Sequence, residues 1–261
     1  MDLGLRLKTA LVLGAGGGLG GAIAEALAGE GANVVLADMS AEAAQSRADA
    51  IDPTGARVQT LSWDLGDLEQ IHQQIRNAEA RFGSIDVLVN NTGGPPPTLV
   101  SGQAIDLWLQ HFQGMVLSVI AITDRVLPGM RERGWGRIIT SASSGVIAPI
   151  PNLGLSNALR STLVGWSKTL AREVAHDGVT CNLVVPGRIA TARIAFLDER
   201  KAEREGRSVE EVRRESTDSI PAGRYGLPRE YGQVVAFLAS DAAAYITGSI
   251  IRVDGGLIPN V

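Results

Sequence analysis

Short apolar runs alternate along the chain with longer segments in which apolar positions recur every three or four residues. The runs predict β-strands and the longer segments predict amphipathic helices. The predicted strands are residues 8–14, 32–38, 56–64, 85–91, 136–143, 179–187 and 249–256. The predicted helices lie near 18–30, 41–51, 66–82, 103–131, 152–176 and 228–239. Because strands and helices alternate, the pattern predicts an α/β fold: a doubly wound parallel sheet with helices on both faces.

Short linkers and the absence of internal repeats predict a single domain over residues 1–261. Two segments interrupt the alternation. Residues 93–98, GGPPPT, contain too much proline for a helix or a strand and predict a stiff, extended loop. Residues 191–227 are long and highly charged, and they predict a helical insertion outside the sheet. This insertion is either a solvated helical face or a lid over a ligand site.

The composition is that of an ordinary soluble globular protein, with 45% apolar and 20% charged residues. A net charge of −4 without a basic run gives no indication of nucleic-acid binding. The single cysteine, Cys181, rules out an intrachain disulfide. We expect no membrane partner, because no stretch comes near the roughly 20 apolar residues that span a bilayer. The N-terminus lacks a signal-peptide pattern, so we expect a cytoplasmic protein.

Residues 11–38 contain a glycine-rich turn between a predicted strand and a predicted helix. Gly14 permits a tight turn, and Gly18 and Gly20 let the backbone and the helix N-terminus approach a pyrophosphate. Asp38 lies 18 residues after Gly20, close to the spacing of about 20 for a carboxylate that binds the adenosine ribose. The alternative is a structural turn followed by a surface aspartate, but the strand–helix–strand context favours a dinucleotide.

The carboxylate of Asp38 also bears on the choice of dinucleotide. It can accept hydrogen bonds from a ribose 2′-hydroxyl, and it repels a 2′-phosphate. Gly17 provides no basic side chain that could bind such a phosphate. The sequence therefore predicts NAD(H) in preference to NADP(H).

The spacing Gly14-x-x-x-Gly18-x-Gly20 resembles that of the short-chain dehydrogenase/reductase family, from about residue 5 to residue 256. Leu13 departs from the family, which usually has threonine before the first glycine. Three further motifs are similar to the family's adenine, cofactor and nicotinamide contacts: Asp64-Leu65, Asn90-Asn91-Thr92-Gly93, and Pro186-Gly187 with Thr191. Residues 220–256 resemble the C-terminal signature of bacterial 3-oxoacyl-acyl-carrier-protein reductases.

The resemblance implies a Rossmann-like sheet of about seven strands and a small carbonyl or alcohol substrate. It also implies a homotetramer or homodimer paired through the long helices near 103–131 and 152–176. The cofactor-binding residues that it implies are Gly14, Gly17, Gly18, Leu19, Gly20, Asp38, Asp64, Leu65, Asn91, Thr92, Gly93, Arg160, Pro186, Gly187, Ile189 and Thr191.

The catalytic positions depart from the family, whose site is an asparagine, a serine, a tyrosine and a lysine. Residues 165–187 set the register, because they are similar to the family's segment after the lysine. In that register Arg160 stands at the lysine position, Ser156 at the tyrosine position and Met115 at the asparagine position, while Ser143 retains the serine. We therefore assign Ser143, Ser156 and Arg160 as the candidate catalytic residues.

These substitutions change the chemistry that the site can perform. A phenol near an ammonium can exchange a proton close to neutral pH, whereas a serine hydroxyl is far less acidic. Arg160 keeps the positive charge but cannot act as a base. Met115 removes the amide that would hold a relay water. We expect cofactor binding to survive and the usual acid/base route to be weakened.

Two functions remain open. The first is a divergent NAD(H)-dependent oxidoreductase of the 3-oxoacyl-acyl-carrier-protein-reductase type, with its proton from Ser143, Ser156, a water or the substrate. The alternative is a non-catalytic NAD(H)-binding regulatory or sensor protein. A smaller possibility is non-redox chemistry on the same scaffold, such as a lyase or isomerase step.

Other polar residues carry weaker signals. Arg188 is either an anchor for an anionic substrate or an ordinary ion-paired arginine. His111 is more typical of a helix surface or interface than of a site. The remaining candidates are His72 and His176, expected on helix surfaces, and Asn152 and Asn157, which could orient a carbonyl or cap a helix. Three scattered histidines and one cysteine match no metal-binding spacing.

Overall fold

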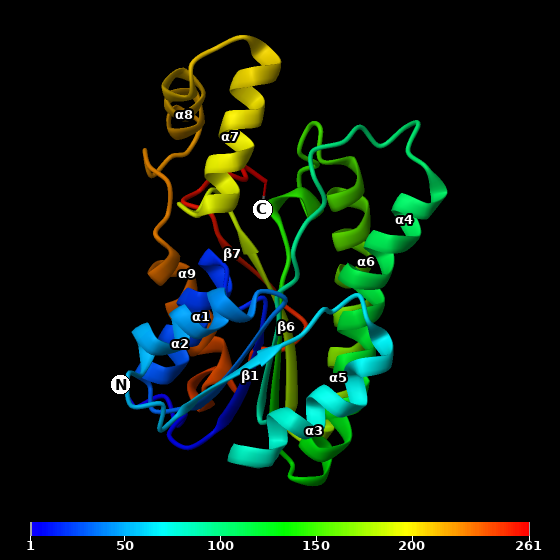
Figure 1. Cartoon of the computed structure of the whole chain (residues 1–261), viewed down its shortest axis with the longest axis vertical. Helices are drawn as coiled ribbons and strands as arrows, with labels where there is room; N and C mark the ends of the chain where they lie inside the picture. The colour runs from blue at the N-terminus through cyan, green and yellow to red at the C-terminus, as the bar shows by residue number, and fades with distance from the viewer. Residues whose placement is uncertain (1, 261) are drawn as a thin grey trace.

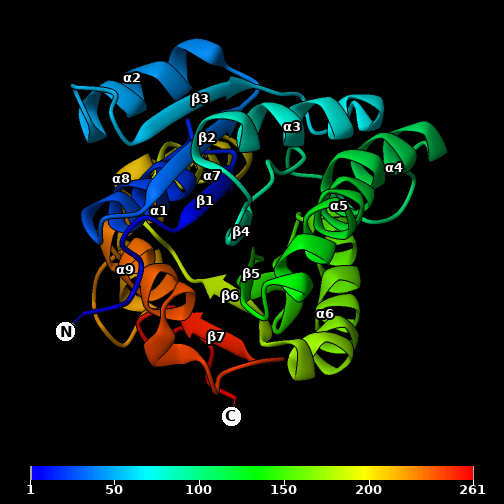
Figure 2. The same ribbon diagram turned by 90° about the horizontal axis from the view of Figure 1, so that it is seen from below.

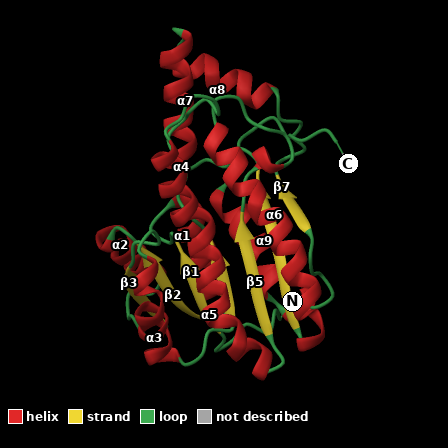
Figure 3. Ribbon diagram, turned by 90° about the vertical axis from the view of Figure 1, so that its right-hand side faces the viewer, coloured by secondary structure: helices red, strands yellow, loops and turns green. Residues whose placement is uncertain are grey.

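The computed structural model describes residues 2–260. Its centre is a seven-stranded sheet with the order β3-β2-β1-β4-β5-β6-β7, in which every neighbouring pair is parallel (Figure 3). The strands are β1 (Thr9–Leu13), β2 (Asn33–Asp38), β3 (Val58–Ser62), β4 (Val87–Asn90), β5 (Gly136–Ser141), β6 (Val179–Pro186) and β7 (Ile250–Val253). The predicted doubly wound α/β fold is confirmed.

Helices cover both faces of the sheet (Figures 1 and 2). One layer contains α1 (Gly18–Gly29), α2 (Ala41–Ile51) and α9 (Pro228–Ala239). The other contains α3 (Ile71–Phe82), α4 (Ile105–Phe112), α5 (Ser118–Glu132) and α6 (Gly154–Val174). Two further helices, α7 (Ala192–Glu205) and α8 (Val209–Asp218), stand beyond the sheet at the end where β6 finishes (Figure 1).

The central strands of the sheet supply side chains to two hydrophobic cores. In β1, Ala10 and Val12 pack into the core beneath α1 and α9, whereas Leu11 and Leu13 pack into the core beneath α3 and α5. This alternation follows from the two-residue period of a β-strand. All five residues of β1 are buried, which explains why the strands are almost continuously apolar. Burying one leucine side chain stabilises the fold by about 1.5–3 kcal/mol.

The predicted helix near 103–131 is interrupted. A π-helical turn, Gln113–Leu117, separates α4 from α5, and it makes the i→i+5 hydrogen bonds of such turns. The apolar pattern does not reveal this turn, because a π-turn adds one residue without changing the apolar character of its surroundings. Met115 lies inside this turn.

The same helix corrects one expectation about membranes. Residues Ile105–Glu132 form a helix of 28 residues, and an 18-residue segment of it has a mean hydropathy of 1.3. By length and composition alone, this helix could cross a membrane. The expectation concerned stretches of apolar residues, whereas an average tolerates scattered polar residues. Helices of soluble proteins also pass this test, and here α5 packs against α3 and α4 packs against α6.

The sheet reverses its winding direction between β1 and β4, which are neighbours although β2 and β3 separate them in sequence. Ligands of doubly wound sheets bind at this point, outside the carboxyl ends of the strands. The loops that follow β1 and β4 meet there, and the loop after β6 leads from the same edge into α7 (Figure 1).

Candidate active site

The glycine turn brings three backbone segments into close contact. Gly14 has a positive φ of 60°, and a Cβ atom there would lie 2.7 Å from the carbonyl oxygen of Asn91. A Cβ at Gly20 would lie 2.1 Å from the carbonyl oxygen of Gly14. Gly17 caps α1 without a side-chain hydrogen bond. The first amides of α1 are therefore left to bind an anion, and the helix dipole favours it.

Asp38 is tied directly to this turn. Its Oδ2 accepts the backbone N–H of Gly16 at 2.9 Å, and its Oδ1 accepts that of Ser40 at 2.9 Å. Both hydrogen bonds hold the carboxylate at the end of β2, next to the end of β1. A group in this position can accept the hydroxyls of an adenosine ribose.

Two other predicted cofactor residues border the glycine turn and the end of β3. Asn91 donates from Nδ2 to the carbonyl oxygens of Leu13 and Gly14, at 3.1 and 3.3 Å. This hydrogen bonding joins β4 to the turn after β1. Asp64 accepts the N–H of Gly66 at 2.8 Å and is exposed, while Leu65 packs against the core. The loop after β3 is thus shaped by Asp64.

Arg160 lies at the junction of α6, β4 and β5. Its Nη2 donates to the carbonyl oxygens of Thr92 and Gly93 at 3.1 and 3.0 Å, and its Nη1 donates to that of Ser141 at 3.3 Å. Burial, together with the positive charge of Arg193, lowers the pKa of Arg160 to about 10. The group therefore stays protonated at neutral pH, and it cannot act as a base.

Ser143 and Ser156 are placed differently with respect to hydrogen bonding. Ser143, just beyond β5, accepts the N–H of Gly145 at 3.1 Å, and its O–H remains available to donate. Ser156 lies in the first turn of α6 and is 7% exposed, and among residues 2–260 its hydroxyl forms no hydrogen bond. Ser156 and Arg160 are four residues apart on one helix and share a face.

Asn157 and the proline-rich loop fix the start of α6. Asn157 donates from Nδ2 to the carbonyl oxygen of Ile150 at 2.8 Å, so it braces the loop that follows β5. Thr98 donates its N–H to the carbonyl oxygen of Asn152 at 2.8 Å, and its own carbonyl oxygen accepts the N–H of Gly154 at 2.9 Å. The 93–98 loop therefore lies across the first turn of α6. Asn152 and Asn157 shape this region rather than point to a reacting group.

Met115 packs in an apolar cluster between α6 and the helix of the π-turn. It is 4% exposed and belongs to the same buried cluster as Leu155 and Leu159, which flank Ser156 on α6. A thioether in such surroundings cannot hold a water by hydrogen bonding as an amide would. The loss of the relay stays a prediction.

The turn after β6 approaches the glycine turn. A Cβ at Gly18 would lie 2.7 Å from Cγ2 of Thr191, and Thr191 caps α7 by accepting the N–H of Ile194 at 3.4 Å. Two helix N-termini thus face the same space. Pro186 is the last residue of β6, and Gly187 donates its N–H to the carbonyl oxygen of Val253. The side chain of Ile189 is buried, and its backbone forms an isolated parallel β-bridge with Gly226.

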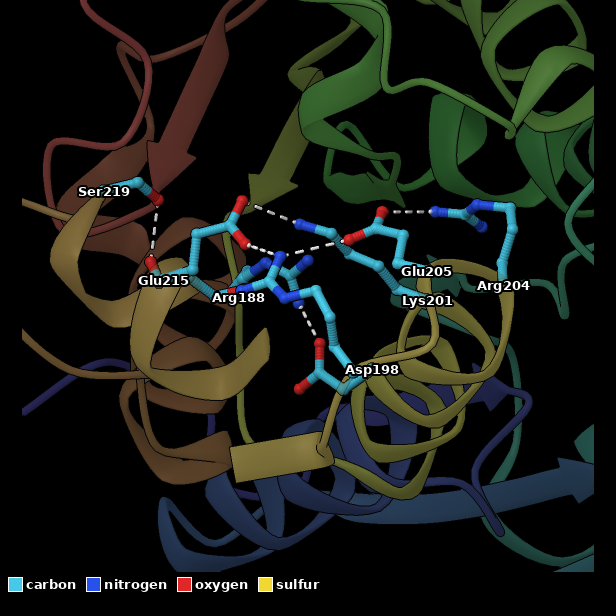
Figure 4. Close-up of polar contacts among 9 residues, drawn as sticks. Arg188, Asp198, Lys201, Arg204, Glu205, Glu215 and Ser219 are labelled. Carbon is cyan, nitrogen blue, oxygen red and sulfur yellow. Dashed lines mark hydrogen bonds and ion pairs between the residues drawn. The ribbon is translucent and has the colours of Figure 1, made fainter. Parts of the chain in front are cut away.

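Arg188 is ion-paired, so it does not serve as a free anchor for a substrate. Its Nη1 lies 2.6 Å from Oδ1 of the fully buried Asp198 (Figure 4). The Tyr225 hydroxyl donates to Oδ2 of the same carboxylate at 2.8 Å. The side chains of α7 and α8 add a second link, Lys201 to Glu215 at 3.0 Å (Figure 4). These contacts fix α7 to α8 and to the turn after β6.

Tyr231, whose position the sequence did not connect with the site, lies behind Arg160. Its hydroxyl is 2.8 Å from the Ser141 hydroxyl and donates to the Val184 carbonyl oxygen at 3.2 Å. The side chain is fully buried, and burial raises its pKa. Tyr231 therefore cannot replace the missing phenol, although Ser141 connects it to the carbonyl that Arg160 binds.

The histidines lie apart from this arrangement. His72 and His176 are exposed on the surface, and His176 is 3.2 Å from Asp177. His111 is partly buried in the last turn of α4. Among the described residues, no group of three histidine, cysteine, aspartate or glutamate side chains could hold a metal ion.

The residues at the carboxyl ends of β1, β2 and β4 fit a dinucleotide. The contacts at Gly14, Gly18 and Gly20 leave no room for side chains, the amides of α1 are uncapped, and Asp38 faces the turn. The Oγ1 atom of Thr92 is buried and has no hydrogen-bond partner within residues 2–260. The fold and these residues define a dinucleotide-binding α/β oxidoreductase.

Comparison with known proteins gives the family. Residues 14–258 match the family model described as Enoyl-(Acyl carrier protein) reductase. The chain is 37% identical over 252 residues to 3-oxoacyl-acyl-carrier-protein reductase FabG of Escherichia coli (strain K12). The aligned residues cover 96% of this chain and 97% of that protein. It is 33% identical to D-beta-hydroxybutyrate dehydrogenase of Cupriavidus necator, with 96% and 98% covered.

A solved structure agrees with these relatives. L-sorbose reductase from Gluconobacter frateurii, described as complexed with NADPH and L-sorbose, superposes with a TM-score of 0.93 and 30% identity over 100% of both chains. The chain belongs to the short-chain dehydrogenase/reductase family. It is an oxidoreductase similar to 3-oxoacyl-acyl-carrier-protein reductases.

Proposed function

We propose that the protein interconverts a small ketone and its secondary alcohol with NAD(H), by an acid/base route weaker than the family's. The observation that carries this proposal is the junction at Arg160. Arg160 is held on the carbonyl oxygens of Thr92 and Gly93 beside an intact glycine turn, while the neighbouring acid position is Ser156. These contacts support a proposal in which the cofactor is bound as in the family and the family's proton donor is missing.

The cofactor would be held by the α1 amides, Asp38 and the turn ending at Thr191. When bound in reduced form, the nicotinamide supplies two electrons and a proton to the carbonyl carbon as a hydride. The carbonyl oxygen must then receive a second proton, and this chain's own residues or a water must deliver it.

Ser143 is the better placed of the two serines for this proton. Its Oγ already accepts the N–H of Gly145, which leaves its O–H free to donate to a carbonyl oxygen. Ser156 is covered, and its side chain is shorter than a tyrosine by a ring. Neither hydroxyl is acidic enough to exchange a proton as a phenol does, so in this proposal Ser143 passes its proton to the carbonyl oxygen slowly and regains one from a water.

The charge of Arg160 stabilises the oxygen that becomes negative as the hydride arrives. A fixed cation in a desolvated site acts in this way without reorganising. Losing a positioned acid typically costs about 10²–10⁴-fold in rate. We therefore propose slow turnover that depends on orientation and on Arg160.

Asp38 supports NAD(H) in this proposal, because its carboxylate is held by two amides and would meet a 2′-phosphate as a like charge. The solved structure of L-sorbose reductase is described with NADPH, so cofactor choice needs a direct measurement. The expected result is at least about 10-fold tighter binding of NADH than of NADPH, the ratio that one repulsion of about 1.4 kcal/mol gives.

A non-catalytic sensor is the less favoured function. The relatives are named as reductases and dehydrogenases, and Ser143 retains a hydroxyl with a free donor. A sensor would bind NAD(H) tightly and show no turnover with any ketone or alcohol.

We also propose a homo-oligomer that pairs through the long helices. Ile105 and Leu109 on α4 are 71% and 59% exposed, and Val100 in the preceding loop is 60% exposed. Large apolar side chains gathered at one place on a surface are typical of an interface with another protein. A second copy of the chain would cover them.

The activity is tested with NADH and a series of 3-oxoacyl thioesters, following nicotinamide absorbance. Turnover that falls at least about 10-fold in Ser143→Ala and in Arg160→Ala is expected if these groups act on the carbonyl. Ser161→Ala, an exposed position on the same helix, is the control. Tight NADH binding without turnover on any substrate would contradict the proposal and support the sensor.

A further inference from the structure

Two guanidinium groups meet beside Gly94, in the loop that follows β4. A Cβ atom at Gly94 would lie 3.4 Å from Nη2 of Arg193 and 3.7 Å from Nη2 of Arg160. Arg160 reaches this point from α6, and Arg193 reaches it from the first turn of α7. The Nη2 of Arg193 donates to the carbonyl oxygen of Pro95 at 2.6 Å. Both cations therefore border one small space at the start of the proline-rich loop.

Neither cation has an acidic partner in the part of the chain that the structure describes. No carboxylate of residues 2–260 lies within 4.0 Å of the guanidinium nitrogens of Arg160 or Arg193, although Arg188 is paired with Asp198. Arg160 is 8% exposed, and the pKa values of both arginines are lowered by burial. Two desolvated like charges without a counter-ion are unfavourable, and an anion between them would remove that cost.

Both side chains keep donors for such an anion. A guanidinium carries five N–H groups in a planar fork that suits a carboxylate. Arg160 uses both N–H groups of Nη2 and one of Nη1 on backbone carbonyls, which leaves Nε and the second N–H of Nη1. Arg193 uses one N–H, on Pro95. The buried Oγ1 of Thr92, which lacks a partner within residues 2–260, is a further polar atom in the same loop. The remaining donors make no hydrogen bond to any residue from 2 to 260.

The position of this space distinguishes it from the expected pyrophosphate position. The pyrophosphate belongs at the uncapped N-terminus of α1, beside Thr191, which packs against Gly18. The Arg193 guanidinium is instead turned to Pro95, on the loop that is hydrogen-bonded to Asn152 and Gly154 at the start of α6. A ligand there would lie on the substrate side of Arg160.

We propose that Arg193, together with Arg160, binds a carboxylate of the substrate, so that the natural substrate is a short oxo acid or hydroxy acid. This inference rests on the proposed function and names its substrate class. Arg193 is then a specificity-determining residue, while Arg160 contacts both the carboxylate and the reacting carbonyl. The D-beta-hydroxybutyrate dehydrogenase to which the chain is similar is named for a hydroxy acid.

The test compares acids with their uncharged esters. Acetoacetate is paired with ethyl acetoacetate and 4-oxopentanoate with its methyl ester, each with NADH. We expect kcat/KM to be about 10–100-fold higher for the acids, the range for a hydrogen-bonded charge, mainly through KM. Arg193→Gln brings the acid-to-ester ratio close to one. Arg204→Gln, which removes a charge from the exposed side of α7, leaves that ratio unchanged.

A substitution at Gly94 supplies a second variant with its own matched control. Gly94→Asp places a carboxylate of the protein between the two arginines, and it should abolish the preference for acids. Gly94→Ala should preserve the preference, because its methyl group would make only ordinary van der Waals contacts with both nitrogens. Equal kcat/KM for acids and esters in the unaltered protein would overturn the inference.

Binding without turnover separates this inference from the proposed function. Calorimetry with malonate in the presence of NADH measures carboxylate binding even if no substrate is turned over. The inference is supported if Arg193→Gln weakens malonate binding at least about 10-fold. If the unaltered protein binds malonate in this way but turns over no substrate, the reductase proposal fails and the inference about the carboxylate site stands. If Arg193→Gln instead weakens NADH binding and leaves the acid-to-ester ratio or malonate binding intact, Arg193 serves the cofactor and the inference is wrong.

Discussion

The Oδ2 atom of Asp38 lies 2.9 Å from the backbone nitrogen of Gly16, so the end of β2 is joined to the turn after β1. The second oxygen of the carboxylate accepts the N–H of Ser40 at 2.9 Å. Each oxygen has lone pairs to spare, and both stay fixed at the place where an adenosine ribose would bind. We therefore expect the Asp38 side chain to decide whether NAD(H) or NADP(H) binds more tightly.

Asp38→Asn should lower NADH affinity about 10–100-fold, because hydrogen bonds to a charged group contribute about 1.5–3 kcal/mol. NADPH affinity should stay the same or increase, since the like charge is removed. Calorimetric titration with both cofactors measures the two changes. Asp49→Asn, in the exposed surface of α2, is the control. Unchanged affinity for both cofactors in Asp38→Asn would show that the carboxylate does not contact the ribose.

Gly20→Ala should disrupt the cofactor turn, because its Cβ would lie 2.1 Å from the carbonyl oxygen of Gly14. We expect a loss of about 1–3 kcal/mol in unfolding free energy and weaker NADH binding. Gly29→Ala, at the other end of α1, meets no atom within 4 Å and should stabilise the protein by about 0.5–1 kcal/mol. Urea unfolding and NADH titration of the pair check both outcomes.

Ser156→Tyr combined with Arg160→Lys should raise reductase activity about 10²–10⁴-fold, the range for restoring a positioned acid. The measurement is NADH oxidation with a substrate on which the unaltered protein shows slow turnover. Ser161→Tyr with Arg160→Lys places the phenol on the exposed face of α6 and should give no gain. If the first pair also gives none, Met115 or the shape of the pocket limits the chemistry as well.

Glu230→Gln should reduce stability above pH 4.5 and have less effect in acid. The hydrogen bond from Arg224, followed by that from the N–H of Leu227, lowers the pKa of Glu230 from 4.5 to about 2. Because the folded-state pKa is lowered, the carboxylate stabilises the fold above pH 4.5, and this contribution is lost as pH falls from 4.5 toward 2.

Thermal unfolding of the Glu230→Gln variant and the unaltered protein between pH 3 and pH 7 measures that trend. The difference in Tm should be largest near pH 7 and should shrink steadily below pH 4.5. Glu25→Gln, an exposed position on α1, provides the control. A difference that stays constant down to pH 3 would mean that the helix cap, and not the charge, sets the effect.

Ile105→Glu with Leu109→Glu should dissociate the proposed oligomer, because two charges would replace side chains that are 71% and 59% exposed in the single chain. Light scattering after size-exclusion chromatography gives the mass. Leu7→Glu, at another exposed apolar position, should leave the mass unchanged. An unaltered mass in the α4 variant would place the interface elsewhere or show that the chain is monomeric.

Local patterns in the sequence were sufficient for the sheet and for the glycine turn. The strands are apolar because both faces are buried, and Gly14 and Gly20 are glycine because the backbone there has no room for a side chain. Such constraints act within a few residues or within one strand–helix unit. They are therefore visible without knowledge of the tertiary structure.

Contacts between distant segments were not visible in the same way. Arg193 and Pro95 are 98 residues apart, and Arg188 proved to be paired with Asp198 while Arg193 had no acidic partner within residues 2–260. Tyr231 reached Ser141 across 90 residues. Each of these contacts depends on where helices pack, and charge alone does not distinguish a paired arginine from an unpaired one.

The π-turn at Gln113–Leu117 changes the direction, about the common helix axis, in which the side chains of α5 point relative to those of α4. Each helical residue rotates the chain by about 100°, so one extra residue offsets the apolar stripe of α4 from that of α5 by about that angle. α4 can then face α6 while α5 faces α3. Removing a single residue from the turn would bring the halves back into phase and rotate Ile105 and Leu109 away from their present direction. The anomaly in one turn thus sets the direction in which the apolar surface of α4 points.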